Sequence, residues 1–153
     1  MITFCERWFR RKKRIIGPIK VEDALKLEKE GNPYTVIIGN PQHPDCFIEI
    51  NSGSYGVSFL DEFKREYLRY TFKEESNGML FLYETIFREY NEESDSILTG
   101  TIYWFSTDGK VKIEKSKAPF KKAELIEKET DVSKNWEKKP EFGKYDNLIK
   151  KER

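Results

Sequence analysis

Apolar and polar residues alternate along the middle of the chain, and this pattern predicts β-strands. The clearest case is TGTIYWFSTDGKVKIEK, 99–115, where two alternating runs meet at Asp108-Gly109, residues that suit the positive φ of a hairpin turn. Runs with alternating, β-branched or aromatic character also occupy 34–39, 46–50, 55–59, 65–75 and 79–90. Strands that follow one another in this way favour antiparallel pairing.

Two segments have helical rather than strand character. Residues 20–30 place acids early and lysines late, and Gly31 and Pro33 follow as stop signals, so we predict a short helix there. In APFKKAELIEKET, 118–130, the apolar residues have near-helical spacing after Pro119, which predicts a second helix. We therefore expect an α+β fold, with a mainly antiparallel twisted sheet of about five to six strands and helices near the N- and C-termini.

The length of 153 residues fits a single domain, 1–153, with a core large enough to need no disulfide or metal. Within it, we expect 1–14 to form a basic N-terminal segment and 131–153 a charged C-terminal extension that packs on or flanks the body. The apolar residues that can anchor this extension are Trp136, Phe142, Tyr145, Leu148 and Ile149.

Composition narrows the class of protein. Disordered chains are poor in aromatic residues, whereas 14% of this chain is aromatic and 36% is charged, so we expect it to fold. Without the five cations of 10–14 the net charge of +1 becomes −4, so the body lacks the broad basic surface of a general nucleic-acid binder. Cys5 and Cys46 are far apart, and no secretory signal or membrane-spanning apolar run is recognisable. We expect reduced thiols, no membrane association and a cytoplasmic location.

A run of cations lies near the N-terminus, between an aromatic pair and an isoleucine pair. It consists of Arg10, Arg11, Lys12, Lys13 and Arg14. Such a run can act as a nucleic-acid arm, a membrane tether or a targeting label, or it can be the solvated end of a segment held down by Trp8 and Phe9. We favour the last interpretation, because isolated charge runs are usually solvated.

Catalytic chemistry has little support in the sequence. The single histidine, His43, precedes Cys46 by three residues, and such a pair can form a nucleophile with its base or part of a zinc site. Zinc needs four ligands, Cys5 is the only other thiol, and no oxyanion donor or phosphate-binding loop is identifiable. We therefore predict no catalytic residues, no metal and no cofactor, and keep an enzyme built on His43 and Cys46 as a third hypothesis.

The stretch REYNEESDS, 88–96, concentrates acids beside aromatic positions. Its candidate partner-binding residues are Glu89, Tyr90, Glu92, Glu93 and Asp95. A negative patch of this kind attracts a basic partner and accelerates encounter, and tyrosine is enriched at protein interfaces. We therefore predict that this surface binds another protein.

Two stretches resemble the small bacterial immunity proteins of polymorphic or contact-dependent toxin systems. They are PYTVIIGNPQHPDCFIEINSGSYGVSFLDE, 33–62, and FLYETIFREYNEESDSILTGTIYWFSTDGKVKIEK, 81–115. The likeness lies in size, in aromatic-rich strands closed by an F-x-x-DG-x-V hairpin, and in the lack of catalytic groups. The resemblance implies a non-enzymatic inhibitor that binds and neutralises a cognate toxin, often a nuclease, and it identifies no individual contact residue.

An RNA-associated module is the alternative function. It would use the basic run 10–14 for phosphate contacts and strand aromatics such as Tyr103 and Trp104 for base stacking. Aromatic residues without Arg and Lys interleaved on the same face more often pack a sheet or line a protein interface. We therefore place nucleic acid below a protein partner.

Overall fold

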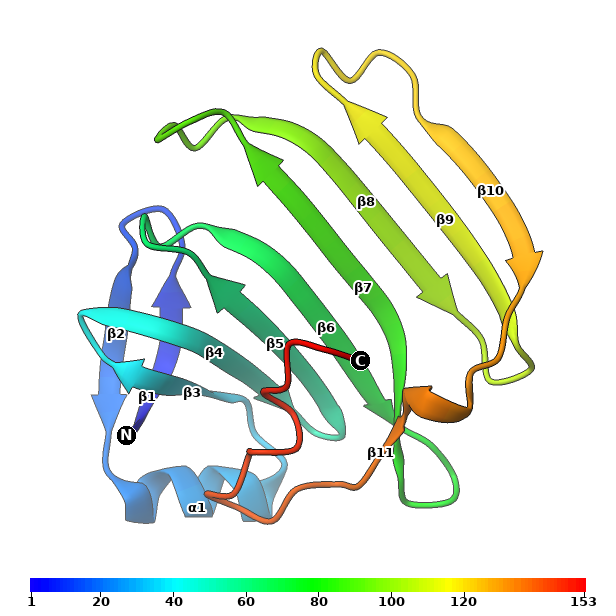
Figure 1. Cartoon of the computed structure of the whole chain (residues 1–153). Helices are drawn as coiled ribbons and strands as arrows, with labels where there is room; N and C mark the ends of the chain where they lie inside the picture. Colours follow the sequence, from blue (N-terminus) through cyan, green and yellow to red (C-terminus); the bar gives the residue numbers. More distant parts are fainter.

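The computed structural model describes all 153 residues, which form one antiparallel sheet of eleven strands and a single α-helix (Figure 1). The strands are β1 Ile2–Phe9, β2 Arg14–Ile19, β3 Tyr34–Asn40, β4 His43–Asn51, β5 Ser54–Leu60, β6 Glu66–Glu74, β7 Leu80–Tyr90, β8 Ile97–Phe105, β9 Lys110–Lys117, β10 Glu124–Glu129 and β11 Trp136–Glu137. Their order across the sheet is β10-β9-β8-β7-β6-β5-β4-β3-β1-β2, and β11 pairs with β7. From β3 to β10, each strand therefore pairs with the next one along the chain.

The helix α1, Val21–Glu30, confirms the helix predicted over 20–30. Gly31 ends it in the left-handed conformation with φ of 70°, and its N–H donates to the carbonyls of Leu27 and Glu28. Ala24 is fully buried against the sheet. This helix is not long and apolar enough to cross a membrane.

The hairpin predicted at Asp108-Gly109 is also confirmed, and it joins β8 to β9. Gly109 has φ of 91°, a conformation that favours glycine, and its N–H donates to Ser106 O. The carboxylate of Asp108 accepts a hydrogen bond from the N–H of Lys110 at 3.1 Å. Local turn chemistry therefore sets the register of these two strands.

The front face of the sheet, toward the viewer in Figure 1, carries the main hydrophobic core. Its strand residues include Val36, Ile48, Val57, Phe72 and Leu80. After β10 the chain forms a short 3-10 helix, Ser133–Asn135, and then β11. The segment after β11 has no regular secondary structure, crosses the front of β5 and β6, and buries Tyr145 and Leu148 in this core (Figure 1). Phe142 stacks on Phe4 with ring centroids 5.1 Å apart, and Tyr70 Oη donates to Lys151 O. The C-terminal extension is therefore a structural cover of one half of the sheet.

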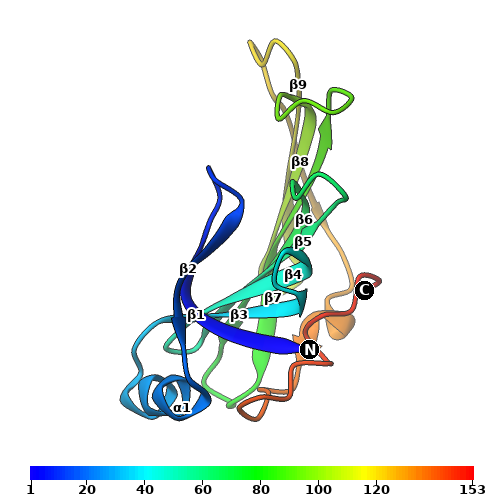
Figure 2. The ribbon, with the colours of Figure 1, turned by 90° about the vertical axis from the view of Figure 1, so that its left-hand side faces the viewer.

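The β1–β2 hairpin bends away from the rest of the sheet on its back side (Figure 2). Trp8 packs there on Phe47, with ring centroids 5.8 Å apart, inside a second small core. The other buried residues of this core are Cys5, Ile37 and Leu60. The bend brings the tip of the hairpin close to polar residues of the central strands.

The predicted α+β class is wrong, because the protein is mostly β and contains a single α-helix. The helix predicted over 118–130 is absent, and β10 lies there instead, with Ile126 opposite Ile113 of β9. The short sequence ELIEKE permits either conformation, and pairing with the open edge of β9 selects the strand. Four strands, β1, β2, β10 and β11, lie outside the segments predicted as strands, and the sheet has eleven strands instead of about five to six.

Candidate binding surfaces

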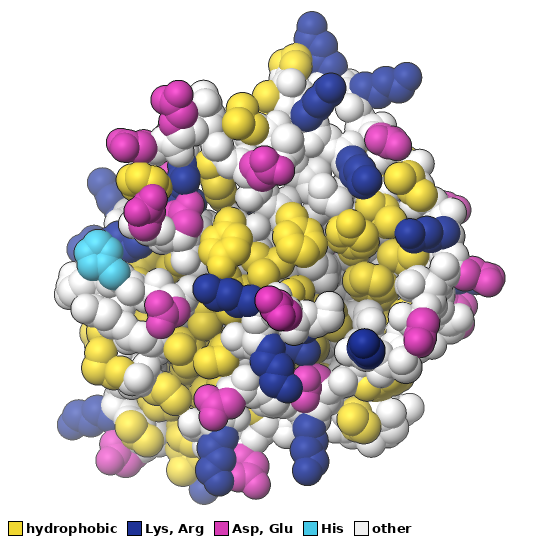
Figure 3. Space-filling model, viewed as in Figure 1, with side chains coloured by type: hydrophobic (Ala, Val, Ile, Leu, Met, Phe, Trp, Pro, Cys, Tyr) yellow, Lys and Arg dark blue, Asp and Glu magenta, His cyan; other side chains and the backbone are white.

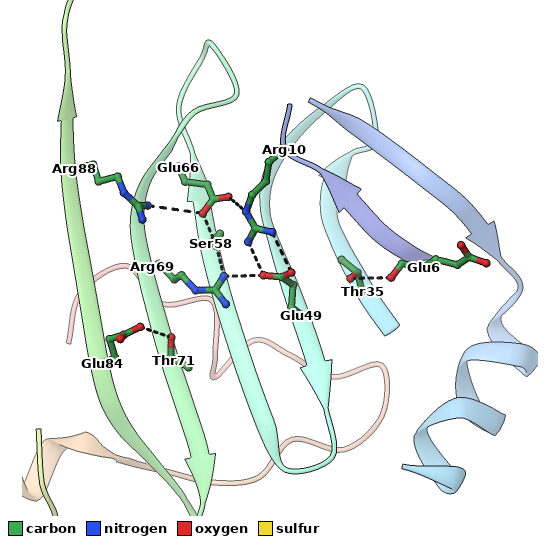
Figure 4. Close-up of polar contacts among 10 residues, drawn as sticks. All are labelled: Glu6, Arg10, Thr35, Glu49, Ser58, Glu66, Arg69, Thr71, Glu84 and Arg88. Carbon is green, nitrogen blue, oxygen red and sulfur yellow. Dashed lines mark hydrogen bonds and ion pairs between the residues drawn. The ribbon is translucent and has the colours of Figure 1, made fainter. Parts of the chain in front are cut away.

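The basic run occupies the turn between β1 and β2 and the first residue of β2. Arg10 extends from this turn across the back of the sheet, where Nη2 donates to Glu49 at 2.6 Å and Nε donates to Glu66 at 2.5 Å (Figure 4). Lys13 Nζ donates to Asp95 at 2.7 Å and to the carbonyl of Phe63 at 3.0 Å. Two of the five cations therefore hold the hairpin to the body of the protein.

The other three cations of the run are Arg11, Lys12 and Arg14, and all three are exposed. They form no ion pair within the protein. The interpretation of the run as a solvated end therefore describes these three residues, whereas Arg10 and Lys13 are part of the tertiary structure.

A connected set of polar side chains lies beneath the hairpin on the back face (Figure 4). Arg69 Nη1 donates to Glu49 at 2.9 Å and to Ser58 Oγ at 2.7 Å, and Ser58 Oγ donates to Glu66 at 3.2 Å. A Cβ at Gly56 would overlap the guanidinium of Arg69, so glycine provides the space for this side chain. These residues belong to β4, β5 and β6, and they meet because neighbouring strands present them on the same face.

The charge of this set depends on Glu49. Burial favours the neutral form of Glu49, but the hydrogen bond from Arg10 and the positive charges of Arg69 and Arg10 outweigh that effect and lower its pKa. Glu49 is therefore ionised at neutral pH and fixes two arginine side chains that come from different parts of the sequence.

The five residues proposed for partner binding do not lie on one surface. Glu89 is exposed on the front face, where it lines a hollow with Phe87, whereas Tyr90 points to the back and donates from Oη to Glu66 O at 2.7 Å. Glu92 and Glu93 are exposed in the β7–β8 turn. Asp95 is 68% exposed and pairs with Lys13.

The β7–β8 turn carries the acidic residues, but its backbone is held in place by a cation, Arg65. Nη1 of Arg65 donates to the carbonyls of Glu92 and Ser94, both at 2.6 Å, and its guanidinium lies 4.7 Å from the ring centre of Tyr90. Arg65 also pairs with Asp61 at 2.9 Å. The sequence interpretation missed this residue, because Arg65 lies some 27 positions before Glu92 in the chain.

A cleft of about 330 Å³ lies between the tip of the β1–β2 hairpin, the β5–β6 turn and the β7–β8 turn. Five of its side chains are cationic, and they are Arg10, Lys13, Lys64, Arg65 and Arg88. Only two acids, Glu66 and Asp95, line the same space. The basic run and the acidic stretch, far apart in sequence, therefore both contribute side chains to the lining of one cleft, where Lys13 and Asp95 form an ion pair.

His43 and Cys46 do not form a reactive pair. His43 is exposed at the start of β4, whereas Cys46 is buried in the front core. Burial and the neighbouring Asp45 raise the pKa of the Cys46 thiol to about 12, so it stays protonated and unreactive at neutral pH. The structure contains no group of three or more His, Cys, Asp and Glu residues placed to bind a metal ion.

An aromatic strip on the front of β7 and β8 was not recognised as a site in the sequence. Phe87 packs edge-on against Tyr103, and Tyr103 stacks on Phe105 with ring centroids 6.1 Å apart. These three side chains line one side of a groove of about 270 Å³, which Asn135 also lines. The C-terminal extension does not cover this strip, and the side chain of Phe87 is 44% exposed. Figure 3 shows apolar side chains exposed across this face.

The groove continues past Phe87 into a hollow with charged walls. Its charged lining residues are Glu89, Lys115, Lys117, Lys122 and Glu124. Successive residues of a strand point to opposite faces, so the sequence of 99–105 implies that Tyr103 and Phe105 share one face, but it does not show that this face lacks a cover. That depends on where the distant residues 131–153 lie.

Comparison of the chain with protein families, curated proteins and solved structures finds no match. Its function therefore has to be inferred from these surfaces and their chemistry.

Proposed function

We propose that the protein is a non-enzymatic binding protein, specifically an immunity protein that neutralises a bacterial toxin. The observation that supports this proposal is the aromatic strip of the exposed Phe87 and the half-buried Tyr103 and Phe105, which lies on the half of the front face that the C-terminal extension leaves uncovered. Large aromatic side chains left open on a soluble surface are typical anchors of protein interfaces. The resemblance to immunity proteins supplies the class of partner.

The surroundings of the strip suit a rigid inhibitor. It stands on β7 and β8, and β7 is bonded on both sides by full-length strands, so little conformational entropy is lost on binding. Glu89 lies at one end, and the exposed Glu92 and Glu93 lie in the adjoining turn. Acids in these positions accelerate encounter with a basic toxin surface, such as the substrate groove of a nuclease. In this arrangement Tyr90 and Asp95 hold the turn rather than contact the toxin.

The test is co-expression of the protein with the toxin domain encoded beside its gene, with cell survival as the readout. We expect Phe87→Ala and Tyr103→Ala to abolish protection while thermal unfolding shows that both variants remain folded. Leu125→Ala is the matched control, because Leu125 is 59% exposed on β10, one residue out of phase with the front-facing Ile126. Equal protection by all variants, or a neighbouring gene without any toxin domain, contradicts the proposal.

The charged part of the surface is tested separately. Charge reversal by Glu92→Lys and Glu93→Lys should slow association with the purified toxin at low salt, and the difference should shrink as salt is added. An unchanged association rate at low salt contradicts a role of these two glutamates.

RNA binding is the second candidate, and one observation favours it. Lys115 and Lys117 of β9 lie on the same face as Phe87 and Tyr103, which is the combination of cations and stacking surfaces that single strands require. A filter-binding titration with a single-stranded RNA oligonucleotide tests this function. If RNA binding is sensitive to salt and is weakened by Lys117→Gln, the RNA site lies on this face. If binding is instead lost when Arg11 and Arg14 are neutralised, the RNA site lies at the tip of the β1–β2 hairpin.

A further inference from the structure

The cleft on the back of the sheet has more positive than negative lining groups. Most of its cations are already paired: Arg10 with Glu49 and Glu66, Lys13 with Asp95, and Arg65 with Asp61 and two carbonyls. These pairs are held by hydrogen bonds of 2.5 to 2.9 Å. The charges of the paired groups largely cancel, so the remaining cations, Arg88 and Lys64, determine the electrostatic potential inside the cleft.

Arg88 is the first of these remaining cations. Its side chain is 27% exposed, and its only polar contact is Nη1 to Oε2 of Glu66 at 3.9 Å, beyond hydrogen-bond distance (Figure 4). That carboxylate is already engaged by Arg10 and Ser58. The guanidinium of Arg88 therefore presents its donors to the cleft without an acceptor of its own.

Lys64 provides a second cation at the cleft, because its Nζ makes one hydrogen bond, to the carbonyl of Gln42 at 3.1 Å. An ammonium has three donors, so two are left for a ligand. Trp8, Tyr90 and Ile97 form the apolar part of the wall. The volume of about 330 Å³ lies at the lower end of the range for small-molecule sites.

We propose that this cleft binds the phosphate group of a small phosphorylated ligand, with Arg88 as the main donor and Lys64 as the second. A planar guanidinium donates two parallel hydrogen bonds to phosphate oxygens, and phosphate carries nearly two negative charges at neutral pH. The apolar wall contacts the organic part of the ligand. The site lies on the opposite face from the aromatic strip, and neither Glu92 nor Glu93 of the β7–β8 turn lines it, so its donors are not residues of the proposed toxin surface.

The experiment is isothermal titration calorimetry on the full chain at low ionic strength, with inorganic phosphate and, separately, adenosine monophosphate as ligands. Arg88→Gln should weaken binding of both by about tenfold or more, because it removes charged hydrogen bonds. Arg11→Gln is the matched control: it removes the same charge from an exposed residue that does not line the cleft, and it should leave affinity within about twofold. Lys64→Gln should give an intermediate loss.

The outcomes separate the site from general electrostatic attraction. Tighter binding of adenosine monophosphate than of phosphate would show that the apolar wall contacts the organic part of the ligand. Equal affinity for the two would show that the cleft recognises the phosphate group alone. Equal losses in Arg88→Gln and Arg11→Gln, or no binding of either ligand to the unaltered protein, overturn the proposal. Stronger binding of a short polyglutamate peptide than of phosphate also overturns it, because the cleft would then select carboxylates.

Discussion

Leu148 tests whether the C-terminal extension is part of the cooperative fold. Its side chain is fully buried in the front core, although it lies in a charged segment without regular secondary structure after β11. Leu148→Ala removes three carbon atoms from this core. At roughly 0.8 kcal/mol for each buried carbon the transfer contribution is about 2 kcal/mol, and the cavity left behind adds about 1 kcal/mol. We expect the free energy of unfolding to fall by about 3 kcal/mol.

Urea unfolding followed by tryptophan fluorescence measures this change, because unfolding exposes the three tryptophans, and one of them, Trp136, belongs to the same C-terminal extension and packs on Phe81 with ring centroids 4.9 Å apart. The midpoint should fall with an unchanged slope, and Tm should fall by about 6 to 12 °C for a chain of this size. Leu125→Ala, at a mostly exposed position, should change stability by less than about 0.5 kcal/mol. A loss of similarly small size in Leu148→Ala would refute the reasoning, because residues 131–153 would then lie on the sheet without stabilising it.

Three further predictions concern the back face and the thiols. Glu49→Gln should cost about 1 kcal/mol at pH 7, a value reduced for screening because the carboxylate is 34% exposed. Because the pKa of Glu49 is lowered in the folded state, its contribution to the free energy of unfolding is fully present above its ordinary pKa of 4.5 and is lost as pH falls through the lower folded-state pKa. In urea unfolding from pH 7 to pH 3, the free energy of unfolding of the variant should therefore decrease less steeply with falling pH than that of the unaltered protein. Gly56→Ala should destabilise the protein by about 1 to 3 kcal/mol in the same assay, because the new Cβ displaces Arg69; a neutral effect would contradict the close packing. Burial raises the pKa of Cys5 to about 11 and of Cys46 to about 12, so Ellman's reagent at pH 8 should label neither thiol until the protein unfolds.

Local signals in the sequence were sufficient for several elements. Helix α1 was predicted from its acids, lysines and Gly31, and the β8–β9 hairpin from Asp108-Gly109. The central strands were predicted from alternation or β-branched residues. In each case the determining interactions join residues only a few positions apart, and the conformational preference is therefore written into a short stretch.

Elements whose conformation depends on a distant partner were missed. Strands β1 and β2, on either side of the charged run 10–14, were not predicted from the sequence. They form because β1 pairs with both β2 and β3 and because Trp8 packs on Phe47. The segment 124–129 has apolar residues compatible with helix or strand, and it is a strand because β9 offers an unpaired edge. A short apolar run does not carry this information by itself.

The candidate sites show the same division. The sequence by itself determined which residues carry charge and aromatic rings, and that acids concentrate beside aromatic positions in 88–96. Only the tertiary structure decided that Tyr90 faces Glu66, that Arg10 and Arg88 meet one cleft, and that residues 131–153 leave Phe87 uncovered. The physical reason is that period-two alternation assigns a side chain to one of two sheet faces, whereas contacts between segments distant in sequence determine what covers each face.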